Sequence, residues 1–338
     1  MFVPVVDNNQ NPLMPTKRNR AWRWIRSGRA TPFRKKGMLC VRLNEDPSGT
    51  EVQAIAVGVD PGSKREGFSV KSEAHTFLNV QAEAVSHVKE AVEVRRNMRR
   101  GRRYRHGPCR KNRQNRAKGG IPPSTFARWN WKLRVCKWLC KIFPVTIFVV
   151  EDIKAESRKG CRKWNHSFNP LQVGKKWFYD RLGEMGNLCL KSSFETYEMR
   201  VALGLKKSKN KMAEVFEAHC VDAWVLAHWA VGGDLVPENK AMLCLKSLRL
   251  HRRQLHAFQF AKGAVRRPYG STRSHGFKRG SLVKHPKWGL TYVGGVLKDR
   301  LSLHCVKTGK RLTQTAKPQD VTFLCYNVWP NKLIKGAA

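Results

Sequence analysis

The chain has 338 residues, and its 66 Lys and Arg residues against 24 Asp and Glu residues give a formal net charge of +42. A field of this size needs a polyanion to neutralise it, and long nucleic acid is a stronger candidate than an anionic membrane. The hydrophobic fraction of 41%, with 11 Trp and 15 Phe, excludes a disordered basic tail protein. A chain of this length accommodates two or three domains.

Nothing in the sequence predicts a membrane or secretory segment. No segment approaches the ~18 apolar residues that cross a bilayer. The N-terminus has no basic region ahead of its apolar patch, which Asp7 interrupts, so it does not resemble a signal peptide. Ten cysteines are scattered from Cys40 to Cys325 without a C-x-x-C pair, which is typical of reduced, packing thiols. We expect a cytoplasmic protein with no membrane partner.

The N-terminal residues predict a small separate unit. A short apolar strand over residues 2–6 precedes a turn, and a basic amphipathic stretch covers residues 17–29. Residues 33–43 predict a second strand, followed by a polar linker. Trp22 and Trp24 alternate with arginines in the basic stretch, and the pattern fits stacking on bases as well as it fits core packing.

The central region predicts an α/β core. Residues 54–60 form an apolar run that ends in Asp-Pro-Gly, which is typical of a buried strand that stops at a turn. Two short strands over 67–71 and 76–80 complete a meander, and a helical period begins near residue 84. The further elements expected are a helix capped by Ser124 and running to about 140, a strand over 145–150, and helices over 171–184, 194–203 and 212–230.

The C-terminal region changes in composition. Residues 246–338 contain twenty Lys or Arg residues and only two acids, Asp299 and Asp320. Short predicted strands alternate there with glycine turns, at residues 276–283, 290–297, 301–306 and 321–326. This pattern predicts a small β-barrel-like domain.

Three acids lie in apolar contexts of this basic chain. Asp60 ends the first strand of the meander, Glu151 ends the strand over 145–150, and Asp222 lies in the apolar run of the last long helix. A buried acid is costly without a cation or a hydrogen-bond partner. Acids on a meander, a later strand and a helix are the ingredients of a ribonuclease-H-like nuclease core, in which carboxylates hold two divalent metal ions. Mg²⁺ suits such oxygen ligands, and Mn²⁺ is an alternative.

His219 lies three residues before Asp222, so both project from one helical face. A neutral imidazole there could orient or deprotonate the attacking water, or bind a metal. Each residue also has an ordinary interpretation: Asp60 as part of a turn, Glu151 as a surface strand end and His219 as a helix-surface histidine. The order and spacing of the whole set favour the nuclease hypothesis.

The segment over residues 95–118 holds twelve Lys or Arg in 24 positions and no acid. Charge runs are often merely solvated. This run continues an amphipathic helix, however, and it is rich in arginine, whose planar fork suits phosphates and stacks on bases. We therefore predict a nucleic-acid-clamping helix. Its binding residues would be Arg95, Arg96, Arg99, Arg100, Arg102, Arg103, Tyr104, Arg105, Arg110, Arg113 and Arg116.

Five motifs in order resemble a known family. VGVDPGSKREGFSV, FVVEDIKA and HCVDAWVLA resemble the three motifs of the RuvC nuclease domain of transposon-encoded RNA-guided nucleases. The arginine-rich segment resembles their bridge helix, and NPLMP at residues 11–15 resembles the signature of their PLMP domain. Together they indicate the IscB/IsrB group. Only 67 residues separate Glu151 from His219, without HNH residues, so the chain resembles IsrB, which lacks the HNH domain.

The resemblance implies a fold and a division of the chain. The fold would be α/β, with a ribonuclease-H-like RuvC core. The implied parts are a PLMP domain (1–50), RuvC part I (51–85), an Arg-rich bridge helix (86–120), RuvC parts II and III (121–240) and a C-terminal β domain (246–338) that reads a target-adjacent motif. Asp60, Glu151, His219 and Asp222 would be the catalytic set, and the three acids would be the metal ligands.

The same resemblance implies an activity. A monomeric protein in a bacterial or archaeal ribonucleoprotein would bind a guide (omega) RNA and open double-stranded target DNA by base pairing. The RuvC site would then nick the displaced non-target strand. Two alternatives stay open: an unguided RuvC-type junction resolvase, which has no need of the basic run, and a non-catalytic RNA-binding protein, which has no need of the three acids.

Overall fold

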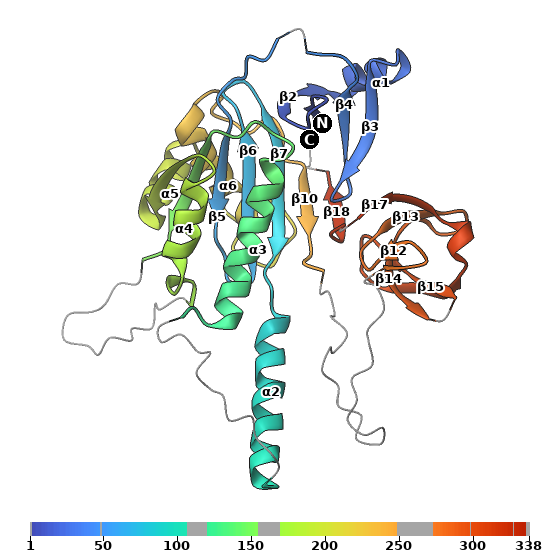
Figure 1. The fold of residues 1–338 in the computed structure, drawn as a ribbon. Coiled ribbons are helices and arrows are strands. Elements are labelled where there is room, and N and C mark those ends of the chain that lie inside the picture. The colour runs from blue at the N-terminus through green and yellow to red at the C-terminus, as the bar shows by residue number, and fades with distance from the viewer. Residues whose placement is uncertain are drawn as a thin grey trace, which may run out of the picture. The chain divides into compact units, whose positions relative to one another are not determined.

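The computed structural model describes residues 2–47, 49–106, 120–154, 170–248, 273–297, 299–326 and 328–335 (Figure 1). The described residues form a mixed α/β fold with six α-helices, which confirms the α/β class. The chain divides into two compact units, one of residues 1–31, 41–244 and 333–338 and the other of residues 32–40 and 245–332. None of the helices in the described ranges has the length and apolar character to cross a membrane.

The main sheet of the first unit grows from the predicted meander. β5 (Ala56–Asp60), β6 (Arg65–Lys71) and β7 (Thr76–Glu83) are antiparallel neighbours, as the sequence predicts. β8 (Ile147–Asp152) pairs in parallel with β5, and β9 (Asn187–Ser192) in parallel with β8. The order is β18-β10-β7-β6-β5-β8-β9, where β10 is Met242–Leu245 and β18 is Asn331–Ile334. Every residue of β5 is buried, as expected for a central strand.

Helix α6 (Phe216–Val231) packs on β5 and β6 at unusually close range. A Cβ atom at Gly58 would overlap the carbonyl oxygen of Ala223, and one at Gly67 would overlap that of His219. Glycine at these two positions therefore lets the helix backbone lie directly on the strands. Eleven of the sixteen residues of α6 are buried, all of them between Phe216 and Ala227, so the helix belongs to the core except for its last turn, where Trp229 is 46% exposed.

The other face of this sheet is covered by α3 (Pro123–Leu139), as Figure 1 shows. The predicted cap at Ser124 is wrong, because α3 has Pro122 as its N-cap and Pro123 as its first residue. Proline is well tolerated at this first position, because a backbone N–H there would have no partner within the helix. α4 (Lys175–Gly183) packs on α3 through Phe178, which stacks on Trp129 with ring centroids 4.9 Å apart. α4 is shorter than predicted because residues 170–172 form a 3-10 turn.

α5 (Ser193–Ala202) follows β9 directly, and α2 (His87–Tyr104) precedes α3. α2 has no buried residue and extends past the ends of the strands of the sheet (Figure 1).

The sequence does not predict strand β9. Its sequence, NLCLKS, contains no β-branched residue, so its position beside β8 comes from tertiary pairing rather than from local propensity.

The N-terminal residues form a four-stranded sheet in the order β2-β1-β4-β3, with one helix. Its elements are β1 (Phe2–Val6), β2 (Pro12–Lys17), α1 (Arg18–Arg26), β3 (Ala30–Lys35) and β4 (Met38–Leu43). The single strand predicted over 33–43 is wrong, because positive φ angles at Lys36 and Gly37 turn the chain between two strands. Trp24 packs into the core of this sheet, whereas Trp22 is 40% exposed.

The second unit contains a five-stranded antiparallel sheet in the order β16-β15-β14-β13-β17. Its strands are β13 (Leu282–His285), β14 (Gly289–Leu297), β15 (Arg300–Cys305), β16 (Arg311–Ala316) and β17 (Thr322–Cys325), beside the short hairpin β11 (Arg273–Ser274) and β12 (Phe277–Lys278). β16 was missed. The ladder runs from one edge strand, β16, to the other, β17, so within the described residues the antiparallel sheet is present without barrel closure.

Candidate active site

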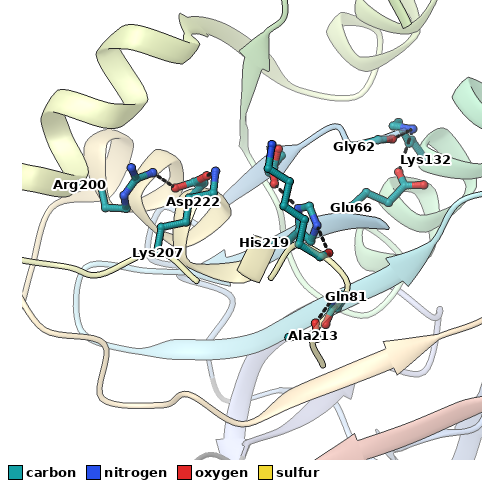
Figure 2. Close-up of polar contacts among 11 residues, drawn as sticks. Gly62, Glu66, Gln81, Lys132, Arg200, Lys207, Ala213, His219 and Asp222 are labelled. Carbon is teal, nitrogen blue, oxygen red and sulfur yellow. Dashed lines mark hydrogen bonds and ion pairs between the residues drawn. The ribbon is translucent and has the colours of Figure 1, made fainter. Parts of the chain in front are cut away.

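Asp60 and His219 meet where β5 ends beside the first turn of α6. His219, which Figure 2 labels, has Nδ1 2.8 Å from Asp60 Oδ2 and Nε2 3.0 Å from the carbonyl oxygen of Lys211. Burial alone would lower the pKa of His219, but the hydrogen bond and charge of Asp60 and the Lys211 carbonyl raise it above the ordinary value. Both partners are acceptors, so both ring nitrogens donate and the imidazolium form is favoured.

Asp222 lies one helical turn beyond His219 and is 1% exposed. Arg200 of α5 donates from Nη1 to its Oδ1, and Lys207 donates from Nζ to its Oδ2 (Figure 2). Both carboxylate oxygens therefore have a cationic partner, which a buried acid requires.

Glu151 is brought beside Asp60 by the parallel register of β8 and β5. Val59 pairs with Val150, so the next residue of each strand emerges at the same end of the sheet. Burial and the negative charge of Asp60, with a smaller contribution from Asp222, raise the pKa of Glu151 to about 7. The Ser193 hydroxyl donates a hydrogen bond to it and acts in the opposite direction. The three acids predicted from the sequence thus act on one another at one end of the sheet.

The ammonium group of Lys207 interacts with all three acids. Partial burial would lower its pKa, but the charges of Asp222, Asp60 and Glu151 raise it. Lys207 lies in the irregular segment between α5 and α6, and its side chain is 33% exposed. The Lys207 side chain therefore brings a positive charge that acts on all three acids.

The donor set fits a divalent metal ion in kind. Asp60, Glu151 and Asp222 offer carboxylate oxygens, the ligands that Mg²⁺ and Mn²⁺ prefer. The positive charge of the Lys207 ammonium group already interacts favourably with all three. Within the described ranges, however, no three acidic, histidine or cysteine side chains lie at the spacing of ligands to one ion. Arg200 and Lys207 each donate to one oxygen of Asp222, so a metal ion bound there would compete with them, and Lys207, the more exposed of the two, is the easier to displace.

Asp152, the next residue after Glu151, serves a different purpose. It lies 2.6 Å from Lys175 Nζ and accepts a hydrogen bond of 2.9 Å from the Tyr179 hydroxyl, both on α4. Successive residues of a strand point to opposite faces, so Glu151 and Asp152 face different helices. Asp152 ties α4 to the sheet and stays outside the acid cluster.

A second buried charge pair lies behind the site. Glu66 of β6 and Lys132 of α3 are both 0% exposed, and Lys132 Nζ lies 3.1 Å from Glu66 Oε2. Burial raises the pKa of Glu66 to about 7 against the opposing charge of Lys132. Neither residue was singled out in the sequence. The alternation of Glu66 with Phe68 and Val70 could have placed its side chain in the core.

The predicted binding helix is α2. The seven arginines from Arg95 to Arg105 are exposed, and no acidic side chain in the described part of the chain is paired with them. Tyr104 is 87% exposed. Arg110, Arg113 and Arg116 lie outside the described residues. The exposed, unneutralised arginines form a positive surface that a polyanion can approach.

Comparison with known proteins finds a family model that matches part of the chain and a similarity to solved structures. Residues 3–162 match a family model described as RRXRR protein. The sequence Arg99-Arg100-Gly101-Arg102-Arg103 in α2 has that pattern of letters. Among solved structures, T. thermophilus RuvC in complex with Holliday junction substrate is similar, with 14% identity and a TM-score of 0.27 over 53% of this chain and 97% of that chain. No curated protein matches the chain.

Proposed function

We propose that the chain is a divalent-metal-dependent nuclease whose site is formed by Asp60, Glu151, Asp222 and His219. The observation that carries the proposal is the convergence of three buried or half-buried acids, in which burial and the charges of Asp60 and Asp222 raise the pKa of Glu151 to about 7. Grouped carboxylates of this kind destabilise a fold unless a cation compensates them, and such strain is typical of functional sites. The sheet order supports it: β7-β6-β5-β8-β9, with an antiparallel meander and two parallel strands, is the ribonuclease H arrangement.

The residues of the chain have distinct tasks in this proposal. A divalent ion held by Asp60, Glu151 and Asp222 would activate water and neutralise the charge that develops on the phosphate. His219 holds Asp60 in place, since both of its ring nitrogens are engaged. The Ser193 hydroxyl orients Glu151, and Arg200 fixes Asp222. Lys207 balances the acids until the ion binds.

We further propose that the nuclease is RNA-guided and of the IsrB kind, nicking the displaced strand of double-stranded DNA. The exposed arginines of α2 and the net charge of +42 support a large nucleic acid partner. Base pairing with a guide delegates sequence recognition to RNA, so the protein needs charge more than base-specific side chains. The motifs of the sequence support the same proposal, as does the length of chain between Glu151 and His219, which carries no HNH residues.

The test uses the full chain with the RNA that copurifies with it. That RNA is sequenced, and a supercoiled plasmid carrying the matching target is incubated with the complex in Mg²⁺. We expect open circles, with the break mapped by strand-specific end labels to the non-target strand. Glu151→Gln should abolish nicking, whereas the control Asp152→Asn should retain it, because Asp152 faces α4.

The alternatives are separated by the same experiment. Cleavage of branched DNA that survives removal of the RNA would favour an unguided junction resolvase. RNA binding without strand scission in either Mg²⁺ or Mn²⁺ would favour a non-catalytic RNA-binding protein. Linear product at early times would contradict a single nicking site.

A further inference from the structure

Helix α5 exposes an aromatic face beside the acid cluster. Phe194 is 67% exposed, Tyr197 53% and Val201 55%. Their spacing of three and four residues places them on one stripe of the helix. The opposite side is already in use, because Thr196 is buried and Met199 packs against the core formed by α6. α5 is therefore apolar on two sides, and one of them meets solvent although burial of such side chains is favourable.

The first turn of α5 is fixed against the site. A capping box holds it: Glu195 N donates to Ser192 Oγ at 3.2 Å, and Ser192 N donates to Glu195 Oε2 at 2.7 Å. Ser193 follows and donates its hydroxyl to Glu151. Phe194, whose ring is exposed, directly follows Ser193 in the chain.

Tyr197 is linked to the site by a second route. The guanidinium of Arg200 lies 5.4 Å from the centre of the Tyr197 ring and also pairs with Asp222. The ring and the carboxylate thus share one cation. Tyr197 thus shares Arg200 with Asp222, and Phe194 directly follows Ser193, the residue that hydrogen-bonds to Glu151.

We propose that Phe194 and Tyr197 form a base-stacking platform that holds an unpaired nucleic acid strand at the acid site. This inference rests on the proposed nuclease function and names the residues that would hold its unpaired strand. Aromatic rings offer flat π faces on which any base can stack, and unpaired bases have faces to offer. Bases inside a duplex stack on one another and present only their edges, so the platform discriminates against a duplex.

Charge complementarity favours this occupant over a protein. Lys206, Lys207 and Lys209 follow α5 in the irregular segment before α6 and are exposed in part or in full. A strand whose bases stack on the rings can place its phosphates against these lysines and toward the acid cluster. A second copy of this chain would bring the same positive charges to the interface and be repelled.

The test measures stacking separately from cleavage. A single-stranded oligonucleotide carrying 2-aminopurine is titrated with the full chain in EDTA, at several salt concentrations up to 1 M, because the net charge of +42 binds any strand electrostatically at low salt. We expect the fluorescence of 2-aminopurine to be quenched. Phe194→Ala and Tyr197→Ala should each weaken single-strand affinity about tenfold, and the double variant should lose the quenching. Affinity for a duplex of equal length should change less than twofold.

Two matched variants sharpen the result. Val201→Ala removes an exposed apolar side chain from the same stripe but no ring, and should leave affinity and quenching unchanged. Tyr197→Phe keeps the ring and should behave as the parent chain does. Equal losses for single strand and duplex would overturn the proposal, and so would a Val201→Ala defect as large as that of the aromatic variants.

Two further outcomes count against the platform. A concentration-dependent dimer that the double variant abolishes would make the stripe an interface between copies of the chain. A fall of more than about 4 °C in the melting temperature of the double variant would show that the rings are packed by the chain itself. Binding is measured in EDTA, so it is independent of cleavage. If the rings cause quenching but the chain never cuts nucleic acid, only the nuclease function is overturned. If cleavage needs the acids but not the rings, only the platform is overturned.

Discussion

The ammonium group of Lys132 lies 3.1 Å from the carboxylate of Glu66, and the two side chains, one on α3 and one on β6, are completely buried. Lys132 Nζ also lies 3.3 Å from the carbonyl oxygen of Gly62, in the turn that follows Asp60. The pair therefore connects the helix on one face of the sheet to the turn that ends the first acid-bearing strand.

Removing one member of this pair should be far worse than removing both. Lys132→Met leaves Glu66 buried without its partner and should lower the free energy of unfolding by about 3–5 kcal/mol. The double variant Glu66→Leu, Lys132→Met should return to within about 1–2 kcal/mol of the parent, since an apolar pair has no desolvation cost. Urea denaturation measures both. The exposed pair Arg181–Glu184, 2.7 Å apart, is the control, and its loss should cost less than about 1 kcal/mol.

Glu151→Gln should stabilise the chain in the absence of divalent ions. The folded pKa of about 7 lies above the ordinary 4.5, so ionisation favours the unfolded state as the pH rises between these values. The variant should equal the parent near pH 4.5 and exceed it by about 1–3 kcal/mol above pH 7. Asp152→Asn should do the reverse and destabilise, because Asp152 is paired with Lys175. A Glu151→Gln variant no more stable than the parent at pH 8 would remove the argument that these acids repel one another.

His219→Gln should lose stability most strongly at low pH. The raised pKa of His219 means that its stabilising contribution is complete below about 6.5 and declines as the pH rises through the folded value. We expect a loss of about 1–2 kcal/mol at pH 6, shrinking by pH 9. His228 on the same helix has its pKa lowered by burial and by Lys71, so His228→Gln should show the opposite trend. Parallel pH profiles for the two variants would contradict the assignment. His219→Ala should also slow nicking without abolishing metal binding.

The arginines of α2 should carry part of the salt dependence of RNA binding. Replacing Arg99, Arg100, Arg102 and Arg103 by Gln removes four charges, and the slope of log affinity against log salt should fall by up to about 3. The same four positions changed to Lys keep the charge and should keep the slope while losing the bidentate contacts. An unchanged slope in the Gln variant would show that this surface is only solvated.

The sequence predicts the strands and the helix that carry the four site residues, because local hydrophobic patterns define these elements. The apolar run before Asp60 and the β-branched run before Glu151 announce buried strands, and the helical period of residues 212–230 places His219 and Asp222 one turn apart. Their convergence then follows from the parallel pairing of β5 with β8 and the packing of α6 on β5. The domain division into five segments and the roles of the four site residues stay predictions.

Other parts of the site leave no mark in the sequence. Arg200 and Lys207 pair with Asp222, but nothing distinguishes them among 66 basic residues. Ser193 reaches Glu151 only because β9 pairs with β8. The sequence of β9 has no β-branched residues, so it does not predict a strand. These residues can be assigned to the site only from the tertiary structure, which brings them to the acids.

The backbone contact of α6 with Gly58 and Gly67 fixes the position of the helix on the sheet. Where main chain lies on main chain, no rotamer change can absorb a shift, so a translation of α6 would have to break the sheet packing itself. Asp60, His219 and Asp222 are therefore held on one rigid body. Lys207 differs from these residues, because its side chain comes from an irregular segment and is partly solvated. In the proposed nuclease, binding of an ion at Asp222 would therefore displace one long side chain, that of Lys207, and would leave helix α6 in place.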